Sequence, residues 1–153
     1  MKIRKFLKGD EQELWALFYN TIHTINIYDY NQTQVDSWAP ADLDINIAIK
    51  KFREINPFVV IKNEKIVGYA DIQSDGYIDH FYCHHQFQRQ GVGRLLFSVI
   101  KEEALKNGIS QMYSNVSITA KPFFEAMGFL VEKEQVVEVQ NQELKNFRMV
   151  FDI

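Results

Sequence analysis

The segment Gln88-Arg-Gln-Gly-Val-Gly93 has the clearest chemical potential in the 153-residue sequence. It stands between a run typical of a strand, residues 77–83, and a run typical of a helix, residues 94–106. Two glycines at such a junction allow a tight turn and a close approach of the backbone to a ligand. The first amides of the helix have no intrahelical acceptor and lie at the positive end of its dipole. The segment therefore predicts an anion site, most naturally for phosphate.

Other interpretations of the glycine pair depend on its context. In a plain loop, the two glycines would only turn the chain. A dinucleotide-binding fold matches poorly, because a β-rich stretch precedes the turn and no second βαβ half follows it. A P-loop requires a closing Gly-Lys-Ser/Thr, which is missing at this point of the sequence. The elements around the turn must therefore decide between a structural loop and a phosphate site.

The composition is that of one ordinary globular domain, which we expect to span residues 1–153. Hydrophobic residues make up 46% of the chain and aromatic residues 14%, enough to bury a core. The formal net charge of −3 gives no electrostatic case for a nucleic-acid partner. No apolar run is long enough to span a membrane, and the basic residues 1–9 lack the apolar run of a secretory signal. The single cysteine suits a reducing compartment, so we expect a cytoplasmic protein with no membrane partner.

The spacing of apolar residues predicts five helices. Four of them begin after a residue that can cap a helix, namely Asp10, Asn31, Asp44 and Thr119. Glu13 follows Asp10 by three residues and completes a capping-box pattern. The helices are expected at residues 11–24, 32–38, 45–55, 94–106 and about 120–127.

Strand-type runs fill most of the remaining chain. Residues 58–83 form an antiparallel meander of three strands, and residues 77–116 form a strand–helix–strand unit whose strands should be parallel. We therefore predict an α/β (α+β) fold, a mixed and mostly antiparallel central sheet of six to seven strands flanked by helices. The strands are expected at residues 3–7, 58–62, 66–72, 77–83, 112–116, 129–139 and 147–151.

The pattern Gln-x-x-Gly-x-Gly after the third meander strand resembles the acetyl-CoA-binding signature of the GNAT N-acetyltransferase superfamily. The likeness covers nearly the whole chain, because the order of elements also agrees. Residues 120–129 are similar to the late helix of the family and its Gly-Phe ending, and residues 115–117 lie where the family splays two parallel strands apart. Residues 24–30, 38–40 and 117–125 further resemble small bacterial members of the YafP type.

This resemblance implies acetyl-CoA as co-substrate and a place for each part of it. Backbone amides from Arg89 to Arg94 would hold the pyrophosphate. The splay between residues 77–83 and 112–116 would admit the pantetheine arm, and an amide near Cys83 would stabilise the oxyanion of the thioester. The cofactor-binding residues implied are Phe81, Tyr82, Cys83, Gln88, Arg89, Gln90, Gly91, Val92, Gly93, Arg94, Asn115, Pro122 and Phe123.

An amine acceptor must lose a proton before it attacks, since a lysine-like amine has a pKa of about 10.4. In the family, the base often comes from positions that match Tyr77 or Asp79, and we favour Asp79 over a purely structural carboxylate. His80 is the second candidate, because its ordinary pKa of about 6.5 suits proton transfer. Period two along residues 77–83 places Asp79 and His80 on opposite faces.

One position departs from the family pattern. Many members have a tyrosine in the late helix that protonates the leaving thiolate, and the matching position here is Phe124. Tyr82 or water could supply this proton instead. The same phenylalanine supports an alternative hypothesis, a non-catalytic acyl-CoA-binding module.

The cluster of His80, Cys83, His84 and His85 invites comparison with a metal site. On a strand, however, His80 and Cys83 point to opposite faces and the adjacent histidines diverge. We therefore expect no metal, and we expect Cys83 to lie beside the cofactor arm rather than to act as a nucleophile.

The family places its acceptor beneath the first helices. That region is rich in aromatic and acidic residues, which suit an amine through cation–π contacts and charge. The sequence does not identify the amine, and a homodimer is left open. The substrate-binding candidates are His23, Tyr28, Tyr30, Trp38, Asp79 and Ser117, with Asp29, Asp36 and Asp42 nearby.

Overall fold

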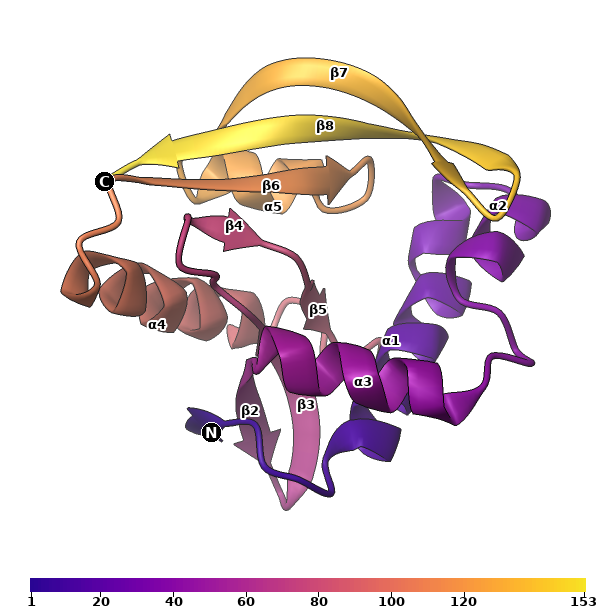
Figure 1. Cartoon of the computed structure of the whole chain (residues 1–153), viewed down its shortest axis with the longest axis horizontal. Helices are drawn as coiled ribbons and strands as arrows, with labels where there is room; N and C mark the ends of the chain where they lie inside the picture. The colour runs from indigo at the N-terminus through magenta and orange to yellow at the C-terminus, as the bar shows by residue number, and fades with distance from the viewer.

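A computed structural model describes all residues 1–153, and its strands form two four-stranded sheets (Figure 1). The first sheet has the order β1-β2-β3-β5 and is antiparallel throughout. The second has the order β4-β6-β8-β7 and contains one parallel pair, β4 with β6. The strands are β1 (Lys2–Lys5), β2 (Phe58–Lys62), β3 (Lys65–Ala70), β4 (Tyr77–Ile78), β5 (Phe81–Cys83), β6 (Gln111–Ser117), β7 (Leu130–Val139) and β8 (Gln142–Asp152).

The predicted fold class is confirmed, with one difference in the strand count. The run expected as one strand over residues 77–83 is broken at Asp79 and His80. Its first part, β4, pairs with β6, while its second part, β5, pairs with β3. The chain therefore has eight strands instead of six to seven, and the broken strand joins the two sheets.

Helices cover both faces of the first sheet, whereas strand β7 of the second sheet is mostly exposed (Figure 1). One side of β2 and β3 packs Val59, Ile66 and Tyr69 against α1 and α3. The other side packs Val60 and Val67 against α4, in a core that continues under β6, α5 and β8. The helices are α1 (Glu11–Thr24), the short 3₁₀ helix η1 (Asn26–Tyr28), α2 (Gln32–Trp38), α3 (Ile45–Ile55), α4 (Val92–Lys106) and α5 (Lys121–Ala126).

Two of the four predicted caps are formed. Asn31 and Gln34 make a complete capping box at α2, and the Asp44 side chain accepts the amide of Asn46 at α3. Side chains that accept nearby backbone amides therefore define these helix ends as expected.

The other two predicted caps form no side-chain cap hydrogen bond, because other partners engage their side chains, although Asp10 is the N-cap residue of α1. The Asp10 carboxylate binds Arg4 and the Leu7 amide, and Glu13 accepts the Ile66 amide from β3. Thr119 donates to Asp29 instead of capping α5, whose N-cap is Ala120.

Gly76→Ala should lower the free energy of unfolding by about 3 kcal/mol or more. Gly76 has φ +93°, and a Cβ there would lie 2.0 Å from the Gln111 carbonyl oxygen, where neither backbone can yield cheaply. Chemical denaturation measures the loss. Gly108→Ala is the matched control, because Gly108 also has a positive φ but no atom within 4 Å of the added Cβ, so only about 1 kcal/mol is expected. Equal losses in the two variants would refute the steric argument.

Candidate active site

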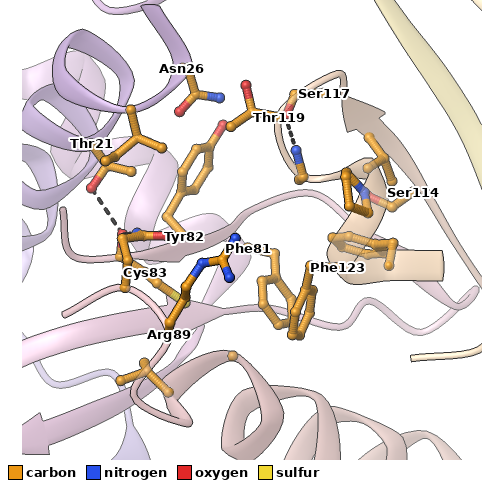
Figure 2. A pocket seen from close by; sticks show the side chains of 18 of the residues that line it. Thr21, Asn26, Phe81, Tyr82, Cys83, Arg89, Ser114, Ser117, Thr119 and Phe123 are labelled. Carbon is orange, nitrogen blue, oxygen red and sulfur yellow. Dashed lines mark hydrogen bonds between the residues drawn. The ribbon is translucent and has the colours of Figure 1, made fainter. Parts of the chain in front are cut away.

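A cavity of about 660 Å³ opens where the two sheets separate (Figure 2). β4 and β6 are paired at Tyr77–Tyr113 and Ile78–Ser114, and the hydroxyl of Ser114 donates to the Ile78 carbonyl at 2.7 Å. Beyond this point β5 turns to β3, so β5 and β6 splay apart. The predicted splay of parallel strands is therefore present, and its two sides line the cavity.

Most of the predicted cofactor-binding residues meet at this cavity. Gln90 does not line it, and its side-chain oxygen instead accepts from Lys62 Nζ at 3.3 Å on the outside of the turn. The predicted residues that line the cavity are Phe81, Tyr82, Cys83, Gln88, Arg89, Gly91, Val92, Gly93, Arg94, Asn115, Pro122 and Phe123.

The glycine turn brings the start of α4 to the cavity wall. Gly91 is the N-cap of α4 with φ +86°, a conformation that glycine adopts without strain. A Cβ on Gly93 would lie 2.9 Å from the ring of Phe123, so a larger residue there would require this ring to shift. The free amides of this first turn thus face the narrow space between α4 and α5, as an anion site requires.

One edge of β5 faces the cavity without a strand partner. β5 ends the first sheet, and its bonds to β3 use His80, Tyr82 and His84, as shown by Asp71 N to His80 O and His84 N to Val67 O. Because backbone groups alternate along a strand, those of Phe81 and Cys83 point to the other side. An extended chain with amide groups, such as the pantetheine arm, can therefore pair with this edge.

The Cys83 carbonyl and thiol have defined surroundings. The carbonyl accepts Thr21 Oγ1 at 3.0 Å, drawn as a dashed line in Figure 2, and Gln88 Nε2 at 2.9 Å. Burial raises the pKa of the Cys83 thiol to about 12. A thiol that stays protonated is a poor nucleophile, so Cys83 forms part of the cavity wall.

Asp79 lies at the break between β4 and β5 and lines the cavity. Its carboxylate is paired with Lys51 Nζ of α3 at 2.5 Å, and its side chain is 24% exposed. It is the only acidic side chain among the lining residues, and the other charged ones, Arg89 and Arg94, belong to the turn and α4. The cavity therefore has a cationic end and a separate carboxylate.

His80 lies outside the cavity, among aromatic rings. It stacks on Phe18 at a centroid distance of 5.3 Å, and its Nδ1 is 2.9 Å from the hydroxyl of Tyr69. The loss of solvent in this packing lowers the pKa of His80 to about 4. Neither its position nor its pKa suits proton transfer to a ligand in the cavity.

Acidification should destabilise the fold through His80. The pKa of His80 is lower in the folded chain than the ordinary 6.5, so the unfolded chain takes up the proton more readily. The contribution of neutral His80 to the free energy of unfolding is therefore fully present above about pH 6.5 and is lost as the pH falls towards 4. The shift corresponds to about 3 kcal/mol at most. We expect His80→Phe, which keeps a ring but cannot titrate, to weaken the dependence of unfolding free energy on pH between 4 and 7. Denaturation curves at several pH values test this, and parallel curves for both proteins would contradict it.

Tyr82 and Phe124 bear on the fate of a leaving thiolate. Tyr82 lines the cavity, and burial raises the pKa of its hydroxyl well above the ordinary value, so the hydroxyl stays protonated at neutral pH but is a weaker acid than an ordinary tyrosine. Phe124 of α5 is buried and packs edge-on against Phe81 at 5.3 Å and against Phe129 at 4.9 Å. The ring at position 124 therefore serves packing and offers no hydroxyl.

The predicted acceptor residues divide into two groups. Trp38 and Ser117 line the cavity. His23, Tyr28 and Tyr30 do not: His23 Nε2 is 2.7 Å from the Ala39 carbonyl oxygen, and Tyr28 is 86% exposed. The buried Tyr30 hydroxyl donates to the Lys145 carbonyl and accepts from the Ile118 amide, which ties η1 and α2 to β8 and the loop after β6.

Several lining residues were not predicted from the sequence to bind the cofactor or the acceptor. Thr21 belongs to α1 and Asn26 to η1, Ile25 lies between these helices, and Thr119 lies in the loop between β6 and α5 (Figure 2). Their residue types are common and their spacing is unremarkable, so no local signal marks them. The remaining ones are Phe87, Ser114, Val116, Ala120 and Phe124.

Two general properties of the molecule complete the description of the site. No group of three or more His, Cys, Asp or Glu side chains is placed to hold a metal ion, and His84 stacks on His85 at 4.5 Å without a third ligand. None of the helices has both the length and the apolar character needed to cross a bilayer.

Comparison with known proteins gives consistent matches over nearly the whole chain. The family model of the acetyltransferase (GNAT) domain matches residues 27–151. The uncharacterized N-acetyltransferase YafP of Escherichia coli (strain K12) is 33% identical over 150 residues, which cover 97% of this chain and 94% of that protein. A GCN5-related N-acetyltransferase from Rhodopseudomonas palustris superposes with a TM-score of 0.95 at 22% identity, over 99% of this chain and 95% of that chain. The PaiA N-acetyltransferase from Thermoplasma acidophilum, in complex with coenzyme A, superposes with a TM-score of 0.77 at 15% identity, over 99% of this chain and 98% of that chain.

The family model and the Escherichia coli relative define an acetyl-CoA-dependent acyltransferase. The chain belongs to the GNAT acetyltransferase family. The family resemblance of segment 88–93 is thereby confirmed, and so is the likeness of residues 24–30, 38–40 and 117–125 to the YafP type.

Proposed function

We propose that the enzyme transfers the acetyl group of acetyl-CoA to a primary amine of a small molecule or peptide by direct attack. One observation carries the proposal. A single cavity connects the amides at the start of α4, the unpaired edge of β5 and the carboxylate of Asp79. These are the groups needed to hold a phosphate-bearing donor, to align its arm and to accept a proton.

The donor would bind along the path of these groups. The amides from Arg89 to Arg94 would hold the pyrophosphate, and Arg89 and Arg94 would add positive charge. The pantetheine arm would pair with the free edge at Phe81 and Cys83, beside Pro122 and Phe123. The rings of Phe81 and Phe123, whose centroids are 5.4 Å apart, would shield the arm from water (Figure 2).

Asp79 would act as the general base. It would take a proton from the ammonium group of the acceptor, directly or through water, and the neutral amine would attack the thioester carbonyl. A backbone amide of β5 would stabilise the oxyanion of the tetrahedral intermediate. When the intermediate collapses, the C–S bond breaks and the products are the acetamide and the thiolate of coenzyme A. Tyr82 or water would return a proton to this thiolate, because Phe124 cannot.

The acceptor would enter the end of the cavity that is lined by α1, η1, α2 and the loop after β6. Apart from Asp79, its side chains there are uncharged: Thr21, Asn26, Trp38, Asn115, Ser117 and Thr119. Hydrogen-bonding groups and one indole ring suit a compact amine or a chain terminus better than a strongly anionic molecule. A reducing cytoplasm, compatible with the single free and half-buried cysteine, remains the proposed location.

A turnover assay distinguishes the enzyme from a non-catalytic acyl-CoA-binding module. Thiol release from acetyl-CoA would be followed with amino acids, polyamines, aminoglycosides and peptides with free N-termini. We expect release that depends on one class of amine, with the acetylated amine visible by mass spectrometry. If acetyl-CoA binds but no amine is acetylated, the protein is an acyl-CoA-binding module and the proposed function is wrong.

A further inference from the structure

The carboxylate of Asp71 is fully buried directly behind the break between β4 and β5. Asp71 follows the last residue of β3, has no exposed surface and does not line the cavity. A buried carboxylate is costly unless hydrogen bonds satisfy it, so its partners indicate what it does there.

Asp71 accepts two consecutive backbone amides. Its oxygens lie 3.1 and 3.2 Å from the amide nitrogen of Asp79 and 2.6 Å from that of His80, and Gln73 Nε2 donates at 2.7 Å. In a regular strand, successive N–H groups point to opposite sides, so one acceptor cannot bind two in a row. The carboxylate therefore stabilises a backbone conformation that is incompatible with an unbroken strand.

This conformation creates the geometry of the cavity. Before the break, the Ile78 carbonyl accepts a hydrogen bond from the Ser114 hydroxyl of β6. After the break, β5 pairs with β3. Asp79 lies between these two anchors, and its own amide is one of the two that Asp71 binds. The direction of the Asp79 side chain towards the cavity therefore depends on a contact made by Asp71 on the opposite side of the backbone.

We propose that Asp71 is a positioning residue for acetyl transfer, which holds the strand break open and sets the place of the Asp79 carboxylate. The proposal rests on the proposed function, in which Asp79 is the base. It assigns to Asp71 no contact with either substrate. Its effect is exerted through the backbone of Asp79 and His80.

The ionised form of Asp71 is the one that accepts both amides. Burial raises the pKa of Asp71 to about 6, although the hydrogen bonds from Gln73, His80 and Asp79 oppose this rise. The titratable groups around it are Tyr69 on β3, Tyr77 on β4, and Asp79 and His80 at the break, with Lys51 of α3 paired to Asp79. Protonation near pH 6 would replace one acceptor site with a donor, so turnover should fall on the acid side of this pH.

Asp71→Asn tests the proposal, because it keeps the size of the side chain but presents an NH₂ group to the backbone amides. We expect kcat to fall about 10-fold or more, with the Kd of coenzyme A from calorimetry within about threefold of wild type. The acid limb of the rate profile near pH 6 should also disappear. Asp75→Asn is the matched control, since this exposed carboxylate binds the Tyr77 amide and Tyr113 hydroxyl but not the break.

A merely structural role would give a different result. In that case Asp71→Asn would lower the melting temperature, while kcat per folded molecule and its pH profile would stay at wild-type values, and the proposal would be overturned.

If Asp71→Asn does not fold, Gln73→Met replaces it. Loss of the Gln73 hydrogen bond should raise the pKa of Asp71 and move the acid limb of the pH–rate profile to higher pH. An acid limb at the same pH as in the wild type would equally reject the proposal. Failure of the wild type to acetylate any amine would be a failure of the proposed function instead.

Discussion

Gly91→Glu should weaken the binding of coenzyme A by about 100-fold, equivalent to about 2.8 kcal/mol. Gly91 is the N-cap of α4 and lines the cavity, so a side chain there would enter the space before the first amides of the helix. The added carboxylate would occupy the positive end of the helix dipole and repel the pyrophosphate. The positive φ of +86° adds strain to any residue with a Cβ.

Isothermal calorimetry with coenzyme A measures this loss. The same substitution at the other end of the helix, Gly108→Glu, is the matched control, because Gly108 also has a positive φ and lies in open space. It should leave the Kd within about threefold of wild type while carrying a similar backbone strain. Unchanged affinity in Gly91→Glu would show that the pyrophosphate lies elsewhere, even if the enzyme is active.

The phosphate turn could be predicted from the sequence because its determinants are contiguous. Two glycines, a strand before them and a helix after them all lie within about thirty residues, and each follows from local rules. The caps at Asn31 and Asp44 were likewise local, since each side chain binds an amide two or three residues ahead. Such features depend little on the rest of the fold.

The interior of the site depends on contacts that the sequence does not display. Thr21 meets the Cys83 carbonyl across 62 residues, and the partners of Asp10 and Glu13 are a side chain of β1 and an amide of β3. Tyr28 illustrates the converse case, because an aromatic residue in the expected region is 86% exposed. Residue type and approximate position were therefore insufficient to select the acceptor side chains.

The strand break is the most consequential feature that periodicity missed. Residues 77–83 alternate as a continuous strand would, and they predict Asp79 and His80 on opposite faces. The side chains are indeed separated, since Asp79 lines the cavity and His80 packs on Phe18. The interruption itself depends on Asp71, whose carboxylate competes with strand pairing for two amides.

Asp79→Asn should lower the rate of amine acetylation at pH 7 by about 10²- to 10⁴-fold, the usual contribution of a general base. The amide cannot take a proton from the ammonium group, while its size and its place at the break are kept. The affinity for coenzyme A should change little, because the phosphate turn is a separate part of the cavity. Asp152→Asn is the control, since this exposed carboxylate binds Gln111 and neither residue lines the cavity.

The pH dependence of the remaining activity separates a base from a carboxylate that only binds the acceptor. An amine with a pKa of about 10.4 gains about 100-fold in its neutral form between pH 7 and pH 9, so the neutral form can then bind without help. If Asp79 is the base, the defect of Asp79→Asn in kcat should shrink as the pH rises. If Asp79 only attracts the ammonium group, the defect should lie in KM and stay nearly constant between pH 7 and pH 9, because most of the acceptor is still charged at pH 9. A variant within about threefold of wild type at pH 7 would exclude both roles and leave deprotonation to water.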